Sequence, residues 1–475
     1  MKKSLCFVCC SLLSASLWAQ EPLASDLSKE VDRVAALIKS NPAGASDGFK
    51  ELLKGKNKKN VALIVAIGQE YLKADKLEEA KNYAEKARDV NSKTAAAHIL
   101  IGDIALKKGD AGTACGAYEQ AMLFDPNNKQ AYYKYAEAYE GVNPQLSVQK
   151  LEEWKAKHPE DIDVDRELAN VYYQMKDYSK AKSAYDTFMQ QGGKPTVQDY
   201  GRYSTLLYLT KDYQQSLDMA QKGLAEDANN HLLKRCRMYD LYELKSYDEG
   251  LKAAESFFSN PNSPDYVYLD YLYHARLFAA VKDYEKAVAE YDKAYKLDNT
   301  HAEIVKEVAD VYEQMQKYPE AIKSYKSYLD AIKDKAEISD LFLFGRLYYS
   351  AASADTASTE RAAYLTSADS IFAQVAERVP DNYLGSFWRA RVNALRDPET
   401  TEGLAKPYYE AALAILEKDP NSATSRKAIL IECQSYLGYY YFLKKEYEQS
   451  KEYWNKILAI DPENATAKQA LEGIH

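Results

Sequence analysis

Histidine and cysteine are the residues of this sequence whose spacing would indicate a zinc site. A catalytic zinc site needs a pair of His such as H-E-x-x-H, and a structural zinc site needs Cys and His at short, fixed spacing. Neither pattern occurs in the sequence. The six histidines are scattered along the chain, at His98, His158, His231, His274, His301 and His475. We therefore predict no metal site.

Motifs for nucleophilic catalysis or phosphate binding are also missing from the sequence. A nucleophile elbow reads G-x-S-x-G, and a phosphate loop needs spaced glycines followed by Lys and then Ser or Thr. The stretch Gly55-Lys56-Asn57-Lys58 has neither the glycine spacing nor the hydroxyl residue. We therefore predict no catalytic residue, no cofactor and no enzymatic activity.

The cysteines and the overall charge exclude further classes of protein. Three of the six cysteines lie near the N-terminus. The other three, Cys115, Cys236 and Cys433, are far apart and odd in number, so they do not form a disulfide framework and are predicted to be buried thiols. Charged residues make up 28% of the chain, and the formal net charge is -9. That charge, without any basic tract, argues against nucleic acid as a partner.

The first residues have the pattern of an export signal. Lys2 and Lys3 precede an apolar stretch from Leu5 to Leu13, and the small residues at positions 14–16 come before Ala19. The stretch is too short to span a bilayer. Because the cysteines of this segment lie within the stretch or near its start, a lipoprotein signal is not predicted. We expect a signal peptide at residues 1–19, no membrane span after its cleavage, and an exported protein that is periplasmic or associated with the cell envelope.

Small residues recur at a fixed interval, which indicates the elements that must position any functional side chain. Gly68, Gly102 and Ala136 are each 34 residues apart. The same interval links Ala80 to Ala114, Ala84 to Tyr118, Ala87 to Ala121, Ala275 to Ala309, Ala287 to Ala321, and Tyr291 to Tyr325. A period of this length is typical of solenoids, in which each unit packs on its neighbours, and 475 residues are too many for one ordinary core.

The sequence resembles the tetratricopeptide repeat family. The family pattern is a small residue and an aromatic residue on a first helix, then Ala, an aromatic residue and Ala on a second helix, and finally Pro. Matching segments are 95–127 (Gly102, Ala114, Tyr118, Ala121, Pro126), 162–190 (Ala169, Tyr172, Ala181, Tyr185, Phe188), 302–330 (Ala309, Tyr312, Ala321, Tyr325, Tyr328) and 431–463 (Gly438, Tyr441, Ser450, Trp454, Ile457, Pro462). The resemblance implies an all-α fold, a superhelical solenoid of antiparallel helix pairs.

The repeats divide the mature chain into predicted regions. Residues 21–60 are expected to form a degenerate helical pair, and residues 61–334 an array of about eight repeats. Residues 338–463 are expected to form further repeats, with an insertion at 350–359 that is rich in Ala, Ser and Thr and is predicted to be a surface loop. Residues 464–475 are expected to form a capping helix, because an array must cover its exposed end.

A tyrosine recurs just before each of several expected second helices, where its ring can pack over the turn between the two helices. These residues are Tyr178, Tyr213, Tyr247, Tyr284, Tyr318 and Tyr447.

The resemblance also implies where a partner would bind, since in this family the first helices line a concave surface. Carried over by position, the partner-binding residues are Arg166, Tyr173, Tyr208, Arg235, Tyr239, Tyr242, Arg276, Arg346, Tyr349, Arg391, Tyr439 and Phe442. Aromatic and Arg side chains dominate binding energy at interfaces, and such a groove would suit a peptide or helix that carries acidic groups. The alternative is that the Arg residues pair with Asp and Glu on neighbouring helices. The slots of the family's carboxylate clamp hold Gln69, Asp103 and Glu137, so chaperone-type binding is not predicted.

Two functions follow as expectations. The first is a non-catalytic interaction scaffold of the bacterial periplasm or cell envelope, which binds a protein or peptide partner on the concave face. The second is an outer-membrane-associated glycan-binding protein, for which exposed Trp would be expected. Trp18 falls in the signal peptide, Trp154 and Trp454 fall at packing slots, and Trp388 falls near the start of a first helix, so the sequence favours the scaffold.

Overall fold

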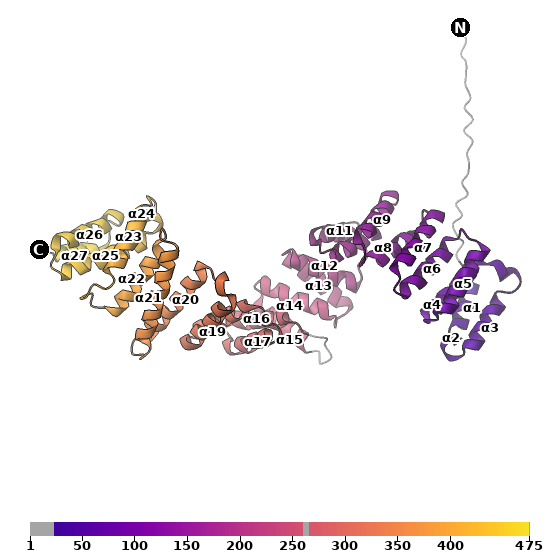
Figure 1. Ribbon diagram of the computed structural model, residues 1–475, viewed down its shortest axis with the longest axis horizontal. Helices are drawn as coiled ribbons and strands as arrows, with labels where there is room; N and C mark the ends of the chain where they lie inside the picture. The colour runs from indigo at the N-terminus through magenta and orange to yellow at the C-terminus, as the bar shows by residue number, and fades with distance from the viewer. Residues whose placement is uncertain (1–22, 260–265, 475) are drawn as a thin grey trace, which may run out of the picture. The chain divides into compact units, whose positions relative to one another are not determined.

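The computed structural model describes residues 23–259 and 266–474, and the predicted signal peptide at 1–19 lies outside these residues. The described residues are helical, with no β-strand among them, which confirms the predicted all-α fold (Figure 1). Within the same residues, no helix is long and apolar enough to cross a bilayer. The chain divides into two units, one up to Cys236 and one from Arg237 onward, and each is described by itself.

The first unit consists of helices joined by short turns. They are α1 (Ser25–Ala35), α2 (Leu37–Ser40), α3 (Pro42–Leu52), η1 (Gly55–Lys59), α4 (Val61–Lys73), α5 (Leu77–Val90), α6 (Ala95–Lys107), α7 (Ala111–Phe124), α8 (Lys129–Tyr139), α9 (Pro144–Lys157), α10 (Asp163–Gln174), α11 (Tyr178–Gln190), α12 (Val197–Leu209) and α13 (Tyr213–Glu226). The predicted N-terminal pair at 21–60 holds α1, α2, α3 and η1, with Val34 and Phe49 in its core.

The second unit continues the same arrangement, and α14 (His231–Glu243) runs across the boundary between the two units. Its helices are α15 (Tyr247–Phe258), α16 (Tyr268–Ala280), α17 (Tyr284–Leu297), α18 (Ala302–Gln314), α19 (Tyr318–Ile332), η2 (Lys333–Lys335), α20 (Ile338–Ala354), α21 (Arg361–Arg378), α22 (Tyr383–Arg396), α23 (Lys406–Leu416), α24 (Ser422–Ser425), α25 (Lys427–Leu443), α26 (Tyr447–Ile460) and α27 (Ala465–Glu472). The helix α27 lies where the sequence predicts the capping helix.

Successive helices pack as antiparallel pairs because the turn between them is tight and stereotyped. The residue at the turn has a left-handed backbone, with φ of 59° at Lys176, 65° at Lys211 and 66° at Lys282, and Gly109 takes the same place with φ of 80°. The residue that begins the second helix is often the predicted Tyr, as in α11 and α17. The pattern of the turn therefore recurs with the repeat.

Small residues allow the two helices of a pair to approach closely, as the sequence predicts. A Cβ atom added to Gly102 would overlap the ring of Tyr118 on the paired helix α7, and one added to Gly438 would lie 2.7 Å from the Trp454 ring. Both rings are buried. Because interiors pack as densely as crystals, these positions have no room for a larger residue.

The predicted loop at 350–359 is shorter in the structure. Helix α20 continues through Ala354, and only residues 355–360 separate it from α21. Ala351 and Ala352 are buried against the core, so the small residues of this run serve helix packing. Composition alone suggested a loop because Ala, Ser and Thr are common in both settings.

Candidate functional site

Four of the predicted binding residues pack against the tyrosine that begins the next helix. The ring centroids of Tyr173 and Tyr178 are 5.9 Å apart, and the same contact recurs in three further repeats. It joins Tyr208 to Tyr213 at 5.8 Å, Tyr242 to Tyr247 at 5.9 Å, and Phe442 to Tyr447 at 6.0 Å. The predicted packing over the turn is confirmed at these places. Part of each ring surface therefore holds the hairpin together.

Two of the predicted arginines are held in ion pairs with the next first helix. Arg276 on α16 donates from Nε to Glu307 on α18 at 2.9 Å and from Nη2 to the other oxygen of Glu307 at 2.5 Å. Arg391 on α22 donates in the same forked way to Glu432 on α25, with Nε at 2.7 Å from the carboxylate. For these two residues the alternative of pairing within the array is confirmed. Their charge is already neutralised, which removes the main reason to expect an acidic partner.

The other predicted residues lie in different surroundings. Arg166 donates to Glu167 at 3.1 Å, and Arg235 approaches His231 at 3.5 Å. Tyr239 is buried, donates to Asp270 at 2.6 Å and stacks on Tyr273, so it is a core residue.

The predicted residues Arg346 and Tyr349 both contact the same ring. The Arg346 guanidinium lies 5.4 Å from the Trp388 ring centroid, and the Tyr349 ring meets Trp388 edge-on at 5.2 Å.

A large cavity lies on the first helices α8, α10 and α12 of the first unit. We call it the Glu137 groove. It has a volume of about 590 Å³ and is lined by Lys129, Gln130, Tyr133, Lys134, Ala136, Glu137, Glu140, Glu167, Asn170, Val171 and Arg202. None of these was chosen from the sequence as a binding residue. The Lys, Gln and Glu residues among them were passed over because only aromatic and Arg side chains were selected, and Tyr133 and Arg202 were not among the positions selected. The positions of two Glu residues nevertheless gave a signal, since Glu137 and Glu140 follow the small residue Ala136 by one and four residues, as Tyr439 and Phe442 follow Gly438.

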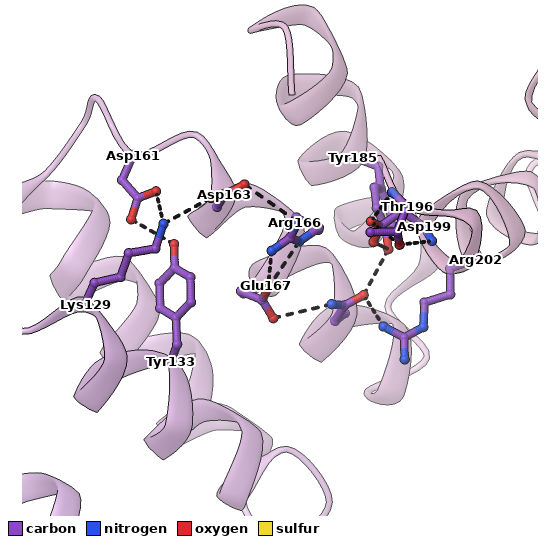
Figure 2. Close-up of polar contacts among 11 residues, drawn as sticks. Lys129, Tyr133, Asp161, Asp163, Arg166, Glu167, Tyr185, Thr196, Asp199 and Arg202 are labelled. Carbon is purple, nitrogen blue, oxygen red and sulfur yellow. Dashed lines mark hydrogen bonds and ion pairs between the residues drawn. The ribbon is translucent and has the colours of Figure 1, made fainter. Parts of the chain in front are cut away.

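The cations of the Glu137 groove are bound by neighbouring side chains, as Figure 2 shows for Lys129 and Arg202. Lys129 donates to Asp161 at 2.7 Å, and Arg202 donates to the Asn170 carbonyl oxygen at 2.6 Å. Lys134 pairs with Asp103 at 2.9 Å.

Two of the three carboxylates that line the Glu137 groove lack a partner among the described residues, whereas the third, Glu167, accepts a hydrogen bond from Arg166. Within the described part of the chain, Glu137 and Glu140 make no hydrogen bond or ion pair. Burial raises the pKa of Glu140, opposed by Arg202 and reinforced by Glu137 and Glu167. The charge left for a ligand is therefore acidic.

A second cavity lies on α16 and α18 of the second unit. We call it the Asp310 groove. Its volume is about 410 Å³, and its lining is Tyr242, Arg276, Ala279, Ala280, Lys282, Tyr284, Tyr291, Glu307, Asp310, Val311 and Gln314. It brings together two predicted residues, Tyr242 and Arg276.

A smaller pocket of about 70 Å³ adjoins the Asp310 groove and shares Asp310 with it. We call it the Tyr325 pocket, lined by Ala309, Asp310, Glu313, Tyr325, Leu343, Arg346 and Leu347. Asp310 lines this pocket from an exposed position, and its pKa is raised to about 6 by desolvation and by Glu313 and Glu307, against the opposing effect of Lys306.

The last two predicted residues lie at the C-terminal end of the array. Tyr439 and Phe442 are exposed and line a mainly apolar cavity of about 190 Å³, together with Trp454 and the helix α27.

Histidine, cysteine and carboxylate side chains are the candidates for metal binding. In residues 23–259 and 266–474, no group of three or more His, Cys, Asp and Glu side chains could hold a metal ion. His98, one of the six histidines, packs on Phe124 at 5.2 Å between ring centroids. The three thiols are buried, as predicted, and burial with the nearby Glu119 raises the pKa of Cys115 to about 12.

Comparison with known proteins gives repeat matches in both units. One tetratricopeptide repeat model matches residues 65–131 and 272–336, and another matches residues 437–464. No curated protein sequence shows significant similarity to the chain.

Three solved structures are similar to parts or most of the chain. The C-terminal part of a TPR repeat-containing protein from Cytophaga hutchinsonii is 28% identical over 57% of this chain and 99% of that chain, with a TM-score of 0.49. A tetratricopeptide repeat protein from Parabacteroides merdae is 16% identical over 60% and 98%, with a TM-score of 0.28. Yeast Tom70 is 14% identical over 88% of each chain, with a TM-score of 0.31.

The family matches coincide with the helix pairs and with their close contacts at small residues, as at Gly102 and Gly438. The chain contains tetratricopeptide repeats in both units.

Proposed function

We propose that the chain is a non-catalytic interaction scaffold of the bacterial periplasm or cell envelope, and that it holds a peptide or protein segment along the first helices of its repeats. Tetratricopeptide repeats form scaffolds for protein interaction. The proposal adds where in the cell the protein acts and what kind of partner it binds. The observation that carries it is the Glu137 groove, an open cavity of about 590 Å³ on three successive first helices.

The chemistry of this groove supports a binding role. Its cations hold fixed positions because they are bound to neighbouring side chains, whereas Glu137 and Glu140 keep their hydrogen-bonding capacity for another molecule. Fixed side chains lose little freedom when a ligand binds, which favours affinity. Excess acidic charge favours a segment that carries Lys or Arg, rather than the acidic segment expected from the sequence.

The groove can be tested with peptides selected from a random display library on the immobilised mature chain. We expect the selected peptides to bind Glu140→Gln at least fivefold more weakly than the unchanged chain. Glu152→Gln is the matched control, since it removes the same charge from an exposed position on α9, the second helix of that repeat. Failure to select any peptide, or equal affinity for both variants, would contradict the proposal.

The proposed location rests on the signal pattern at residues 1–19. We expect the protein recovered from the periplasmic fraction of a bacterial host to have the intact mass of a chain that begins at Gln20. Recovery of the chain with Met1 attached, only in the cytoplasmic fraction, would contradict export.

Glycan binding is the competing outcome. The rings of Trp154 and Trp454 are 4% and 5% exposed, and Trp388 is partly buried among aromatic neighbours, so none of these rings stands open for a sugar to stack on. Calorimetric titration with oligosaccharides should therefore give no heat of binding. A saturable heat would favour the glycan hypothesis over the scaffold.

A further inference from the structure

One tyrosine of the repeat differs from its counterparts in how its hydroxyl group is used. Four tyrosines lie four residues after a buried Ala on their second helix: Tyr118, Tyr185, Tyr291 and Tyr325. The first three donate a hydrogen bond to a first helix. Tyr118 donates to Asp103 at 2.8 Å, Tyr185 to Asn170 at 2.9 Å, and Tyr291 to Glu307 at 2.8 Å. These bonds satisfy hydroxyl groups on rings that are almost fully buried.

Tyr325 has no such bond. Its side chain is 3% exposed, and its hydroxyl oxygen has no hydrogen-bond partner in the described part of the chain. The expected partner is Asp310, which precedes Tyr325 by the same 15 residues that separate Tyr118 from Asp103 and Tyr185 from Asn170. Asp310 and Tyr325 instead line the Tyr325 pocket together. A buried hydroxyl without a partner is costly, so the pocket has a polar group prepared for something else.

The other walls of the pocket define what would fit. Glu313 adds a second carboxylate, and Arg346 adds one guanidinium group, which lies over the Trp388 ring. Among the described residues, neither Asp310 nor Glu313 forms an ion pair with Arg346. The formal charge of the pocket is therefore -1, from two carboxylates and one cation. One additional positive charge would neutralise it.

Size favours a compact cation. A cavity volume of about 10–15 Å³ is enough for one water molecule. The Tyr325 pocket, with about 70 Å³, therefore has room for a small polar group and the atoms next to it. A Lys ammonium is a compact point charge with three donors, whereas an Arg guanidinium is a wider planar fork. Asp310, Glu313 and the Tyr325 oxygen can each accept one of the three ammonium hydrogens. The apolar walls formed by Ala309, Leu343 and Leu347 suit the methylene stem.

We propose that the Tyr325 pocket binds the ammonium group of a lysine side chain supplied by the protein segment that lies in the Asp310 groove. This inference rests on the proposed function, since it needs a bound segment, and it names one residue of that segment. The raised pKa of Asp310 agrees with it, because a carboxylate that lacks a cation is easier to protonate.

The test uses the full mature chain and four pools of fluorescent, N-acetylated nonapeptides. Eight positions are random among uncharged residues, and the central residue is Lys, N-acetyl-lysine, Gln or Glu. Fluorescence anisotropy should show that the Lys pool binds at least tenfold more tightly than the N-acetyl-lysine pool. Asp310→Asn should abolish that preference, and Tyr325→Phe should reduce it three- to tenfold.

Two controls separate binding from folding. Tyr118→Phe removes the same hydroxyl from a slot where it is bonded within the chain, and it should leave all four affinities unchanged. Asp310→Asn should melt at the same temperature as the unchanged chain or higher, because it removes an uncompensated charge. A residue that acts only in folding would instead lower the melting temperature when replaced.

Each other result would overturn the inference. Tightest binding by the Gln or Glu pool would mean that the pocket takes an amide or a carboxylate. A Lys preference that survives in Asp310→Asn would place the ammonium elsewhere. Both results would leave the proposed function standing, whereas no binding by any pool, together with no peptide selected on the Glu137 groove, would end both.

Discussion

The ion pair between Arg276 and Glu307 should stabilise the second unit by a measurable amount. The two side chains are 25% and 26% exposed and share two hydrogen bonds, and Tyr291 donates a third bond to the same carboxylate. Exposed pairs contribute about 0–1 kcal/mol, whereas removing one partner of a buried pair costs about 3–5 kcal/mol. For this half-buried pair, Arg276→Ala should cost about 2 kcal/mol.

A repeat array can open locally, so a global melting temperature would report the direction of the effect but not its full local size. Hydrogen exchange followed by mass spectrometry on peptides from α16 and α18 measures the local cost. A loss of about 2 kcal/mol corresponds to exchange about 30-fold faster in those peptides. Peptides from α25 and α26 should exchange at the unchanged rate.

Two further variants make the experiment specific. Arg346→Ala is the control, since its guanidinium contacts the Trp388 ring and forms no ion pair among the described residues, so its cost should be about 0.5–1 kcal/mol. The double variant of Arg276 and Glu307 should cost less than the sum of the single variants, by about 1–2 kcal/mol. Additive costs, or an equal cost for Arg346→Ala, would refute the structural role of the pair.

Three other predictions concern packing, pH and thiol reactivity. Gly102→Ala should lower the free energy of unfolding by about 1–3 kcal/mol, because the added Cβ overlaps the Tyr118 ring. Gly116→Ala, at an open helical position, should raise it by up to about 1 kcal/mol, and urea unfolding measures both changes. The pKa of Asp310 is raised to about 6 in the folded chain, so proton binding by this carboxyl group favours folding at low pH, and that stabilisation is lost as the pH rises from about 4 to 6. After allowance for solvent exposure, Asp310→Asn should be more stable than the unchanged chain by about 0.5–1 kcal/mol at pH 7.5, with a smaller difference at pH 4.5. Cys115 is buried and its pKa is raised to about 12, so iodoacetamide at pH 8 should label it at least about 100-fold more slowly in the folded chain than in urea, and rapid labelling would contradict its burial.

The helix pairs were predictable from the sequence because one geometric requirement repeats. Gly102 and Gly438 must be small wherever a large ring crosses from the paired helix, and Tyr178 and its counterparts mark the start of second helices. Such requirements act between residues a few positions apart, or one repeat apart, so a single sequence displays them.

The charge of the grooves was not predictable in the same way. Arg276 and Glu307 are 31 residues apart, and Arg391 and Glu432 are 41 residues apart, so their pairing depends on the stagger between first helices. Selection of aromatic and Arg positions identified Arg346 but passed over Glu137, because carboxylates are common on any exposed helix face.

The Tyr325 pocket was beyond the reach of the sequence for a different reason. Tyr325 and Asp310 occupy ordinary slots of the repeat, and the same spacing gives a hydrogen bond at Tyr118. Only the positions of the atoms show that the bond is missing.

The left-handed turns between paired helices have a practical consequence for anyone who wishes to engineer this protein. A non-glycine residue with positive φ is strained by about 1 kcal/mol or more, and Lys176, Lys211 and Lys282 each hold this conformation at a solvent-facing bend. Glycine adopts it freely, as at Gly109. Glycine at these three bends should make the array more resistant to heat and proteases. At Lys176 and Lys211 it leaves the lining of both grooves unchanged, whereas at Lys282 it removes a side chain that lines the Asp310 groove. The additional stability would allow the binding surfaces to be redesigned with substitutions that destabilise the fold.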